Sequence, residues 1–167
     1  MKNKYGITFT ALVITMIIIV ILLSGIIIGY DNIRESTLKR DFAHEIYTIE
    51  KLVEEYDFRY SKYPTNSEIT INLSNVPENE KFQFQGEPGF DDGTITLNIL
   101  NYVELGIENL NYGTGKTSLD YYAISKETGK VYYAAGDEIG DRIYYTLTDE
   151  LAGLIDVIHS TDNTYNN

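Results

Sequence analysis

The chain opens with a long run of apolar side chains. No charged residue lies between Tyr5 and Tyr30, and isoleucine and valine dominate this stretch. As a helix the run would reach about 39 Å, which exceeds the hydrocarbon core of a bilayer at about 30 Å. Because lipid offers the backbone no hydrogen-bond partners, we expect a transmembrane helix over residues 7–30.

The charges beside the run predict its orientation. Lys2 and Lys4 precede it and Asp31 follows it. The positive-inside rule then keeps the N-terminus cytoplasmic and places residues 31–167 outside the cytoplasmic membrane, as a single-pass protein. A cleaved secretory signal is the alternative, but its apolar core is shorter, about 7–15 residues, and Ser24-Gly25-Ile26 matches the cleavage pattern poorly.

An amphipathic pattern continues directly after the apolar run. Apolar side chains recur every three or four positions and form one face of a helix, at Leu38, Phe42, Ile46, Ile49, Val53, Tyr56 and Tyr60. We therefore predict an amphipathic stalk helix over residues 31–63. It continues the transmembrane helix, so that one helix runs from about Ile7 to Tyr60. Pro64 ends it, because proline and the residue before it resist the α conformation.

Alternating side chains between turn residues predict strands in the rest of the chain. Three such stretches are Ile69–Leu73, Lys81–Gln85 and Gly93–Asn98. Three Tyr-Tyr pairs, at 121–122, 132–133 and 144–145, predict a three-stranded antiparallel meander. Neighbouring side chains on a strand face opposite ways, so one ring of each pair should pack on the helix. The other ring should be free for solvent or a neighbouring subunit.

The end of the chain reads as a short closing helix and a polar tail. The helix is expected after Asp149-Glu150, with Leu151, Leu154, Ile155 and Ile158 at helical spacing. Residues 160–167 are polar and are expected to form a flexible tail. The predicted fold is therefore α+β, a long N-terminal helix packed on a small antiparallel sheet, with the head spanning residues 64–159.

Composition narrows the classes of function. The chain has 167 residues, a net charge of −12 and no cysteine. So acidic a surface repels phosphate backbones and anionic lipid headgroups, which argues against nucleic-acid binding and against basic docking to a membrane. Disulfides and thiolate metal sites are excluded.

Few side chains offer candidate chemistry. Gly113–Thr117 looks like the end of a phosphate-binding P-loop, but Leu110 stands where that motif needs a glycine, so we expect an ordinary loop. His44 and His159 have no serine or acid constellation around them, so no enzyme activity and no cofactor is expected.

One acidic turn offers oxygen ligands for calcium. Its candidates are Asp137, Glu138 and Asp141, and a pair of acids at Asp91-Asp92 could add to them. The spacing is not that of an EF-hand, so solvated turn carboxylates remain the preferred interpretation of these side chains.

The first 64 residues resemble the type IV pilin superfamily, which includes the pseudopilins of type II secretion. The resemblance rests on the basic leader Met1–Gly6, the long apolar helix that starts at Ile7, and the segment Tyr56–Pro64 with its closing Tyr-Pro. It implies a pilin-like fold, the long helix being the filament core. It further implies that residues 1–6 are a prepilin leader, that a prepilin peptidase cuts between Gly6 and Ile7, and that Ile7 is N-methylated. Some pseudopilins hold calcium in C-terminal loops.

One position departs from the family pattern. The fifth residue after the cut is usually glutamate, whose carboxylate is thought to pair with a neighbouring subunit's free amine, and here it is Ala11. That departure suits a minor subunit, or a relative that never polymerises. The expected partners are other pilin-like subunits, the prepilin peptidase and the cytoplasmic membrane, and assembly would place the protein in an extracellular filament.

Two alternatives to a filament subunit stay open. The first is an unprocessed, signal-anchored surface protein whose head binds a partner or ligand. The second is a membrane-tethered enzyme, which would need a metal or nucleophile constellation. The pilin reading and the signal-anchor reading differ in whether the Gly6–Ile7 bond is cut.

Overall fold

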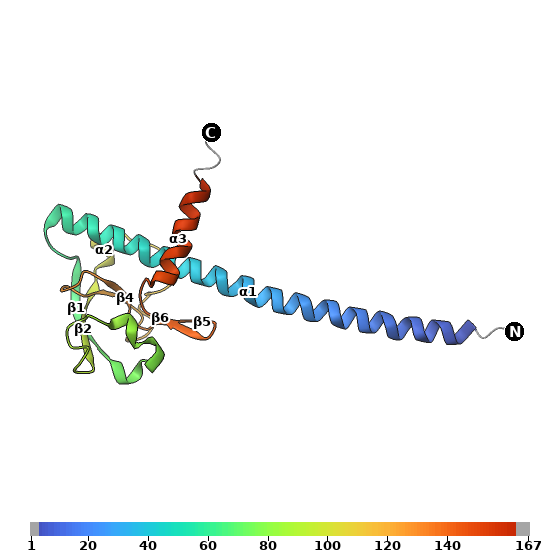
Figure 1. Cartoon of the computed structure of the whole chain (residues 1–167). Coiled ribbons are helices and arrows are strands. Elements are labelled where there is room, and N and C mark those ends of the chain that lie inside the picture. The colour runs from blue at the N-terminus through green and yellow to red at the C-terminus, as the bar shows by residue number, and fades with distance from the viewer. Residues whose placement is uncertain (1–3, 163–167) are drawn as a thin grey trace. The chain divides into compact units, whose positions relative to one another are not determined.

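The structure is a computed structural model that describes the backbone of residues 4–162 and the side chains of residues 12–19 and 33–155. It is an α+β fold with one long helix and small antiparallel sheets, as predicted (Figure 1). The chain divides into two compact units, residues 1–37 and 38–167, and each is described by itself.

Helix α1 runs without interruption from Lys4 to Tyr60, which confirms the single helix predicted from the pattern. No proline or glycine follows Tyr30 within it. The helix ends where Ser61 adopts a left-handed conformation with φ 51°, and its N–H donates to the carbonyl of Asp57 over 2.7 Å. This bond satisfies one of the carbonyls that a helix end leaves open. The last helical residue, Tyr60, lies four residues before Pro64.

The main sheet has four antiparallel strands in the order β1-β2-β3-β4. Their bounds are Thr65–Asn72 for β1, Thr94–Leu100 for β2, Tyr122–Ile124 for β3 and Val131–Tyr133 for β4. Strand β1 pairs with β2 through partners such as Ile71 with Ile95, and β3 with β4 through partners such as Tyr122 with Tyr133. The strands predicted at 69–73 and 93–98 are thus confirmed, although each begins or ends a few residues away.

The strand predicted at Lys81–Gln85 is wrong. That stretch lies in the 3-10 helix η2, Glu78–Phe84, which follows the shorter η1, Leu73–Asn75. The alternation of Phe82 and Phe84 does place one ring outside and one inside, since Phe82 is exposed and Phe84 is buried. The buried Gln83 side chain stabilises the 3-10 helix, because it donates a hydrogen bond to the side chain of Glu80, three residues earlier, over 2.9 Å.

The predicted three-stranded meander is only partly right. Strands β3 and β4 form the expected hairpin, but the third tyrosine pair belongs to a separate two-stranded sheet. There β6, Arg142–Tyr144, pairs with β5, Asp137–Ile139, which we had assigned to a turn. The segment after β6 still bonds to β4, because the N–H of Tyr133 donates to the carbonyl of Tyr145 and the Thr146 hydroxyl donates to the carbonyl of Val131, each over 2.7 Å.

Two apolar cores lie against the tyrosine strands. One contains Tyr122, Tyr133 and Tyr144 together with one face of α1, formed by Phe42, Ala43, Ile46, Ile49 and Val53. The other contains Tyr132 and Tyr145 with Phe84 of η2, and the Phe84 and Tyr132 rings stack with centroids 5.1 Å apart. The prediction that one ring of each pair stays free is therefore wrong for the second and third pairs, because segment 73–93 brings a second core.

Two short helices complete the head. Helix α2, Tyr102–Leu105, is capped by the Asn101 side chain. Helix α3, Asp149–Asp162, confirms the closing helix and continues past residue 160, where we expected the tail to start. Its Leu151 and Ile155 side chains are buried in the first core, while the Ile158 side chain lies outside the described residues.

Candidate functional site

The site predicted at the N-terminus cannot be compared with the structure. Gly6, Ile7 and Ala11 belong to the described backbone of α1, but their side chains lie outside the described residues. The same holds for most of the apolar run. Among the residues whose side chains are described, no helix is long and apolar enough to cross a membrane.

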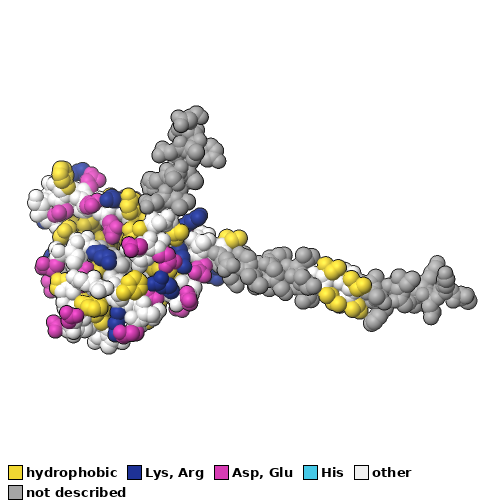
Figure 2. Space-filling view, viewed as in Figure 1, with side chains coloured by type: hydrophobic (Ala, Val, Ile, Leu, Met, Phe, Trp, Pro, Cys, Tyr) yellow, Lys and Arg dark blue, Asp and Glu magenta, His cyan; other side chains and the backbone are white. Residues whose placement is uncertain are grey.

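The described part of the apolar run is exposed. The side chains of Leu12–Ile14 and Met16–Ile19 are between 40 and 62% exposed. Figure 2 shows them as yellow side chains along the first half of α1. A contiguous apolar surface of this kind marks a site for lipid or for another apolar partner.

In the head, Glu45 of α1 anchors the loop that follows α2. Its two carboxylate oxygens accept the backbone N–H groups of Asn111 at 2.9 Å and Tyr112 at 3.0 Å. The Tyr122 hydroxyl also donates to Glu45, over 3.0 Å. Charge-assisted bonds of this kind are stronger than neutral ones, so Glu45 holds the loop against the helix.

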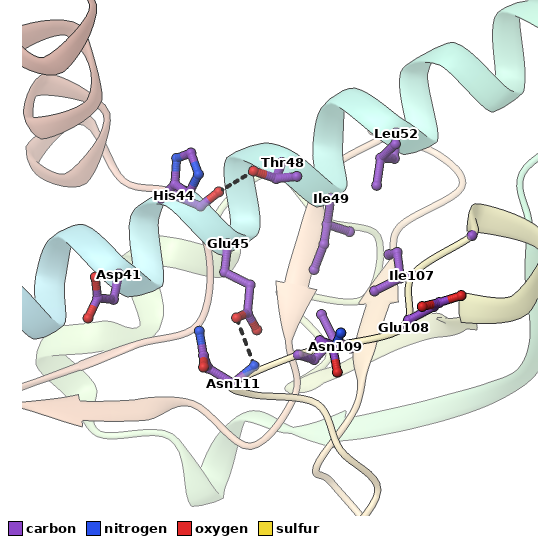
Figure 3. Close-up of a pocket in the computed structure, with 12 residues that line it drawn as sticks. Asp41, His44, Glu45, Thr48, Ile49, Leu52, Ile107, Glu108, Asn109 and Asn111 are labelled. Carbon is purple, nitrogen blue, oxygen red and sulfur yellow. Dashed lines mark hydrogen bonds between the residues drawn. The ribbon is translucent and has the colours of Figure 1, made fainter.

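An open groove of about 480 Å³ lies between α1 and this loop. Ile49 and Leu52 of α1 and Ile107 of the loop turn toward one another there, while Asp41 and Glu108 lie toward opposite ends (Figure 3). No Lys or Arg is among its lining residues. We call this surface the α1–loop groove. It combines an apolar floor with negative charge.

The charged groups of the groove differ in how they are bound. Glu45 is fully engaged by the loop, whereas no hydrogen bond or ion pair is found for the side chains of Asp41 and Glu108 within the described chain. Both are exposed. His44 also lines the groove, but its ring projects from the opposite side of α1 to Glu45 (Figure 3).

Burial and negative neighbours keep the tyrosines of this region neutral. Burial raises the pKa of Tyr102 to about 12. Burial, the charge of Glu45 and the hydrogen bond to it raise the pKa of Tyr122 far above its ordinary value. These hydroxyls therefore act as hydrogen-bond donors and offer no acid–base chemistry near neutral pH.

The segment that resembled a P-loop is a loop, as expected, and its anion site is filled by the protein itself. The Asp120 carboxylate accepts the N–H groups of Gly113 at 3.0 Å and Lys116 at 2.9 Å, and the hydroxyls of Thr114 and Tyr133 at 2.9 Å each. Burial alone would raise the pKa of Asp120, but these four bonds outweigh it and lower the pKa below its usual value. A phosphate would have to displace this carboxylate.

The calcium candidates Asp137, Glu138 and Asp141 lie in and beside the hairpin of β5 and β6. Asp137 is in β5, where burial raises the pKa of its carboxyl group against a weaker effect of its hydrogen bond with Tyr112. Glu138 and Asp141 are exposed. Within the described side chains, no three His, Cys, Asp or Glu residues gather closely enough to hold a metal ion.

A charge network joins α1, η2, β6 and α3. Arg142 of β6 pairs with the buried Glu80 at 3.1 Å and with Glu150 at 2.9 Å, and Lys39 of α1 also pairs with Glu150 at 2.9 Å. The hydrogen bond from Lys39, with help from Tyr144 and Arg142, lowers the pKa of Glu150. The network is structural, since each charge has an opposite partner.

Sequence reasoning did not find Glu45, Glu80 or Asp120. Each is one acid among 25 in the chain, and its partners lie far away or depend on the path of a loop. Asp120 had a faint local signal, because it closes a glycine-rich loop whose backbone amides need an acceptor.

Comparison with protein-family models, with curated proteins and with solved structures finds no match to this chain.

Proposed function

We propose that this protein is a structural subunit of a type IV pilus-like filament or a type II secretion-like pseudopilus, and a minor one. The observation that carries the proposal is the exposed apolar surface at Leu12–Ile19, on a continuous helix whose later part packs into an α+β head. Exposure of such an apolar surface to water is unfavourable, whereas lipid or parallel helices of other subunits would cover it.

The proposed mechanism follows from the charges at the start of the chain. While Lys2 and Lys4 remain, they hold the N-terminus at the cytoplasmic face. A cut between Gly6 and Ile7 removes both lysines. The apolar helix can then leave the bilayer and pack with other helices, and glycine at position 6 leaves the backbone open to the peptidase.

Ala11 supports a minor role within such an assembly. It has no carboxylate to neutralise the amine of a neighbouring Ile7. A buried ammonium without a counter-ion is costly, so a subunit with Ala11 fits best where no amine needs its charge.

The proposal is tested by the mass and the first residue of the full chain, made with and without a prepilin peptidase. We expect a peptidase-dependent chain that starts at N-methylated Ile7. Gly6→Val should block the cut, whereas Gly25→Val, within the same apolar run, should leave it intact. A chain that still starts at Met1, beside a control pilin that is cut, would overturn the proposal and favour the signal-anchored surface protein.

A further inference from the structure

The α1–loop groove selects for an occupant that carries both an apolar side chain and a positive charge. Its apolar floor is made by the half-buried Leu52 and Ile107 beside the fully buried Ile49, and Glu108 lies directly after Ile107. Glu108 is exposed and has no partner within the described chain. No Lys or Arg is among the lining residues, so no cationic side chain of the lining balances Asp41 and Glu108.

The chain itself carries such a segment at Ile33 and Arg34. Ile33 is 67% exposed, although it lies in a helix whose backbone bonds are satisfied. Arg34 is also exposed, and no ion pair is found for it within the described residues. An uncovered isoleucine beside an unpaired arginine is the chemical complement of Ile107 beside Glu108.

We propose that Ile33 and Arg34 of one copy of this chain dock in the α1–loop groove of a second copy. Ile33 covers the apolar floor and Arg34 pairs with Glu108, with Asp41 adding negative potential. The inference rests on the proposed function, because it names the contact through which neighbouring subunits would meet beyond their apolar helices.

Two further features favour a second copy as the occupant. The contact joins two different surfaces, so one copy can present Ile33 and Arg34 while a second copy receives them in its groove. At a net charge of −12, two copies repel each other, so they need a local positive element to meet in one register.

The loop that lines the groove is already held in place before a partner binds. Glu45 already fixes the loop through Asn111 and Tyr112, so the partner does not have to order it. Less conformational entropy is then lost on association.

Cysteine cross-linking of the full chain, made with a prepilin peptidase, tests the contact, and the absence of native cysteine makes the result unambiguous. Arg34→Cys in one tagged copy and Glu108→Cys in another should form a disulfide-linked heterodimer under mild oxidation. A chain with both substitutions should form disulfide-linked dimers under the same conditions. As a matched control, Arg34→Cys with Glu68→Cys, an exposed acid on β1, should not cross-link.

Charge reversal gives a second readout. Arg34→Glu or Glu108→Arg alone should lower cross-linking at a neighbouring pair, Ile33→Cys with Ile107→Cys, by about two- to fivefold, the range for one exposed ion pair. The two reversals together should restore it. Restoration would support a direct pair, whereas equal loss in the double variant would overturn it.

Failure of the contact and failure of the filament are distinguishable. Met16→Cys lies on the exposed apolar surface and reports whether the helices associate at all. Cross-linking at Met16 without cross-linking between positions 34 and 108 would overturn the groove contact and leave the filament subunit intact. An uncut chain that cross-links at neither place would overturn both.

Discussion

The carboxylate of Glu45 on α1 accepts the backbone N–H of Tyr112, 67 residues further along the chain, over 3.0 Å. The same carboxylate accepts the N–H of Asn111 and the hydroxyl of Tyr122. One acid of the helix thus satisfies three donors from the loop and from β3. The loop has no regular secondary structure of its own there, so this acid decides where it lies.

Replacing Glu45 should loosen the loop without unfolding the head. In Glu45→Gln the side-chain amide can accept at one atom only, and its NH₂ group faces donors. We expect a loss of about 2 kcal/mol in the free energy of unfolding, measured with urea. Amide hydrogen exchange at Asn111 and Tyr112 should become faster. Glu54→Gln, which removes an exposed pair with Lys51, should cost far less. Equal effects of the two variants would contradict this prediction.

Asp120 should make stability depend on pH in the acid range. Its folded pKa lies below the ordinary value of 3.8, so its ionised form stabilises the fold above that value. The contribution is lost as pH falls through the lower, folded pKa. Asp120→Asn should therefore cost about 2 kcal/mol at pH 7, and the difference from wild type should shrink toward pH 2.

Urea unfolding of both chains between pH 2 and 7 measures this difference. Asp92→Asn in an exposed turn is the matched control and should unfold like wild type at each pH. A difference between Asp120→Asn and wild type that stayed constant down to pH 2 would show that the charge of Asp120 does not matter.

Removing Arg142 should be costly, because Glu80 is only 1% exposed. Arg142→Met leaves that carboxylate with the weaker donors of Asn79 and Gln83 and should destabilise the head by about 3 kcal/mol in thermal or urea unfolding. Adding Glu80→Gln removes the uncompensated charge and should recover part of the loss. A double variant no more stable than Arg142→Met would refute the pairing as the cause.

The second core can be tested at Phe84, which is fully buried and stacks on Tyr132. Phe84→Ala should cost about 3–5 kcal/mol in unfolding free energy, because it leaves a cavity under segment 73–93. Phe82→Ala, in the same 3-10 helix but 48% exposed, should cost far less. Similar losses would mean that segment 73–93 does not cover the sheet.

The head should fold without the first part of α1. Every residue of the two cores lies between Phe42 and Ile155. A chain that begins at Leu38 should therefore keep the circular dichroism and the cooperative unfolding of the full head. It should also lose partition into detergent, because it lacks the exposed side chains at Leu12–Ile19. Retained partition would place the apolar surface elsewhere.

Some of this architecture could be inferred from local patterns alone. The amphipathic spacing after Asp31 predicted α1 and its buried side chains from Phe42 to Val53, and Pro64 predicted its end. The alternation of apolar and polar side chains likewise predicted β1 and β2. These features follow from the repeat with which side chains face one side of a helix or strand. The order of apolar and polar residues along the sequence shows this repeat directly. Tyr60, the last residue predicted for this apolar face, is 54% exposed.

Long-range contacts decided the rest. Lys81–Gln85 has the alternation of a strand, but Gln83 bonds to Glu80 and to the carbonyl of Ile143, and so forms part of a 3-10 helix. The free face of the tyrosine strands became a second core once that helix covered it. The groove and its anchor at Glu45 likewise needed partners more than 60 residues away. Such contacts exist only after the chain has closed on itself, because no local period encodes which of many acids will meet a distant amide.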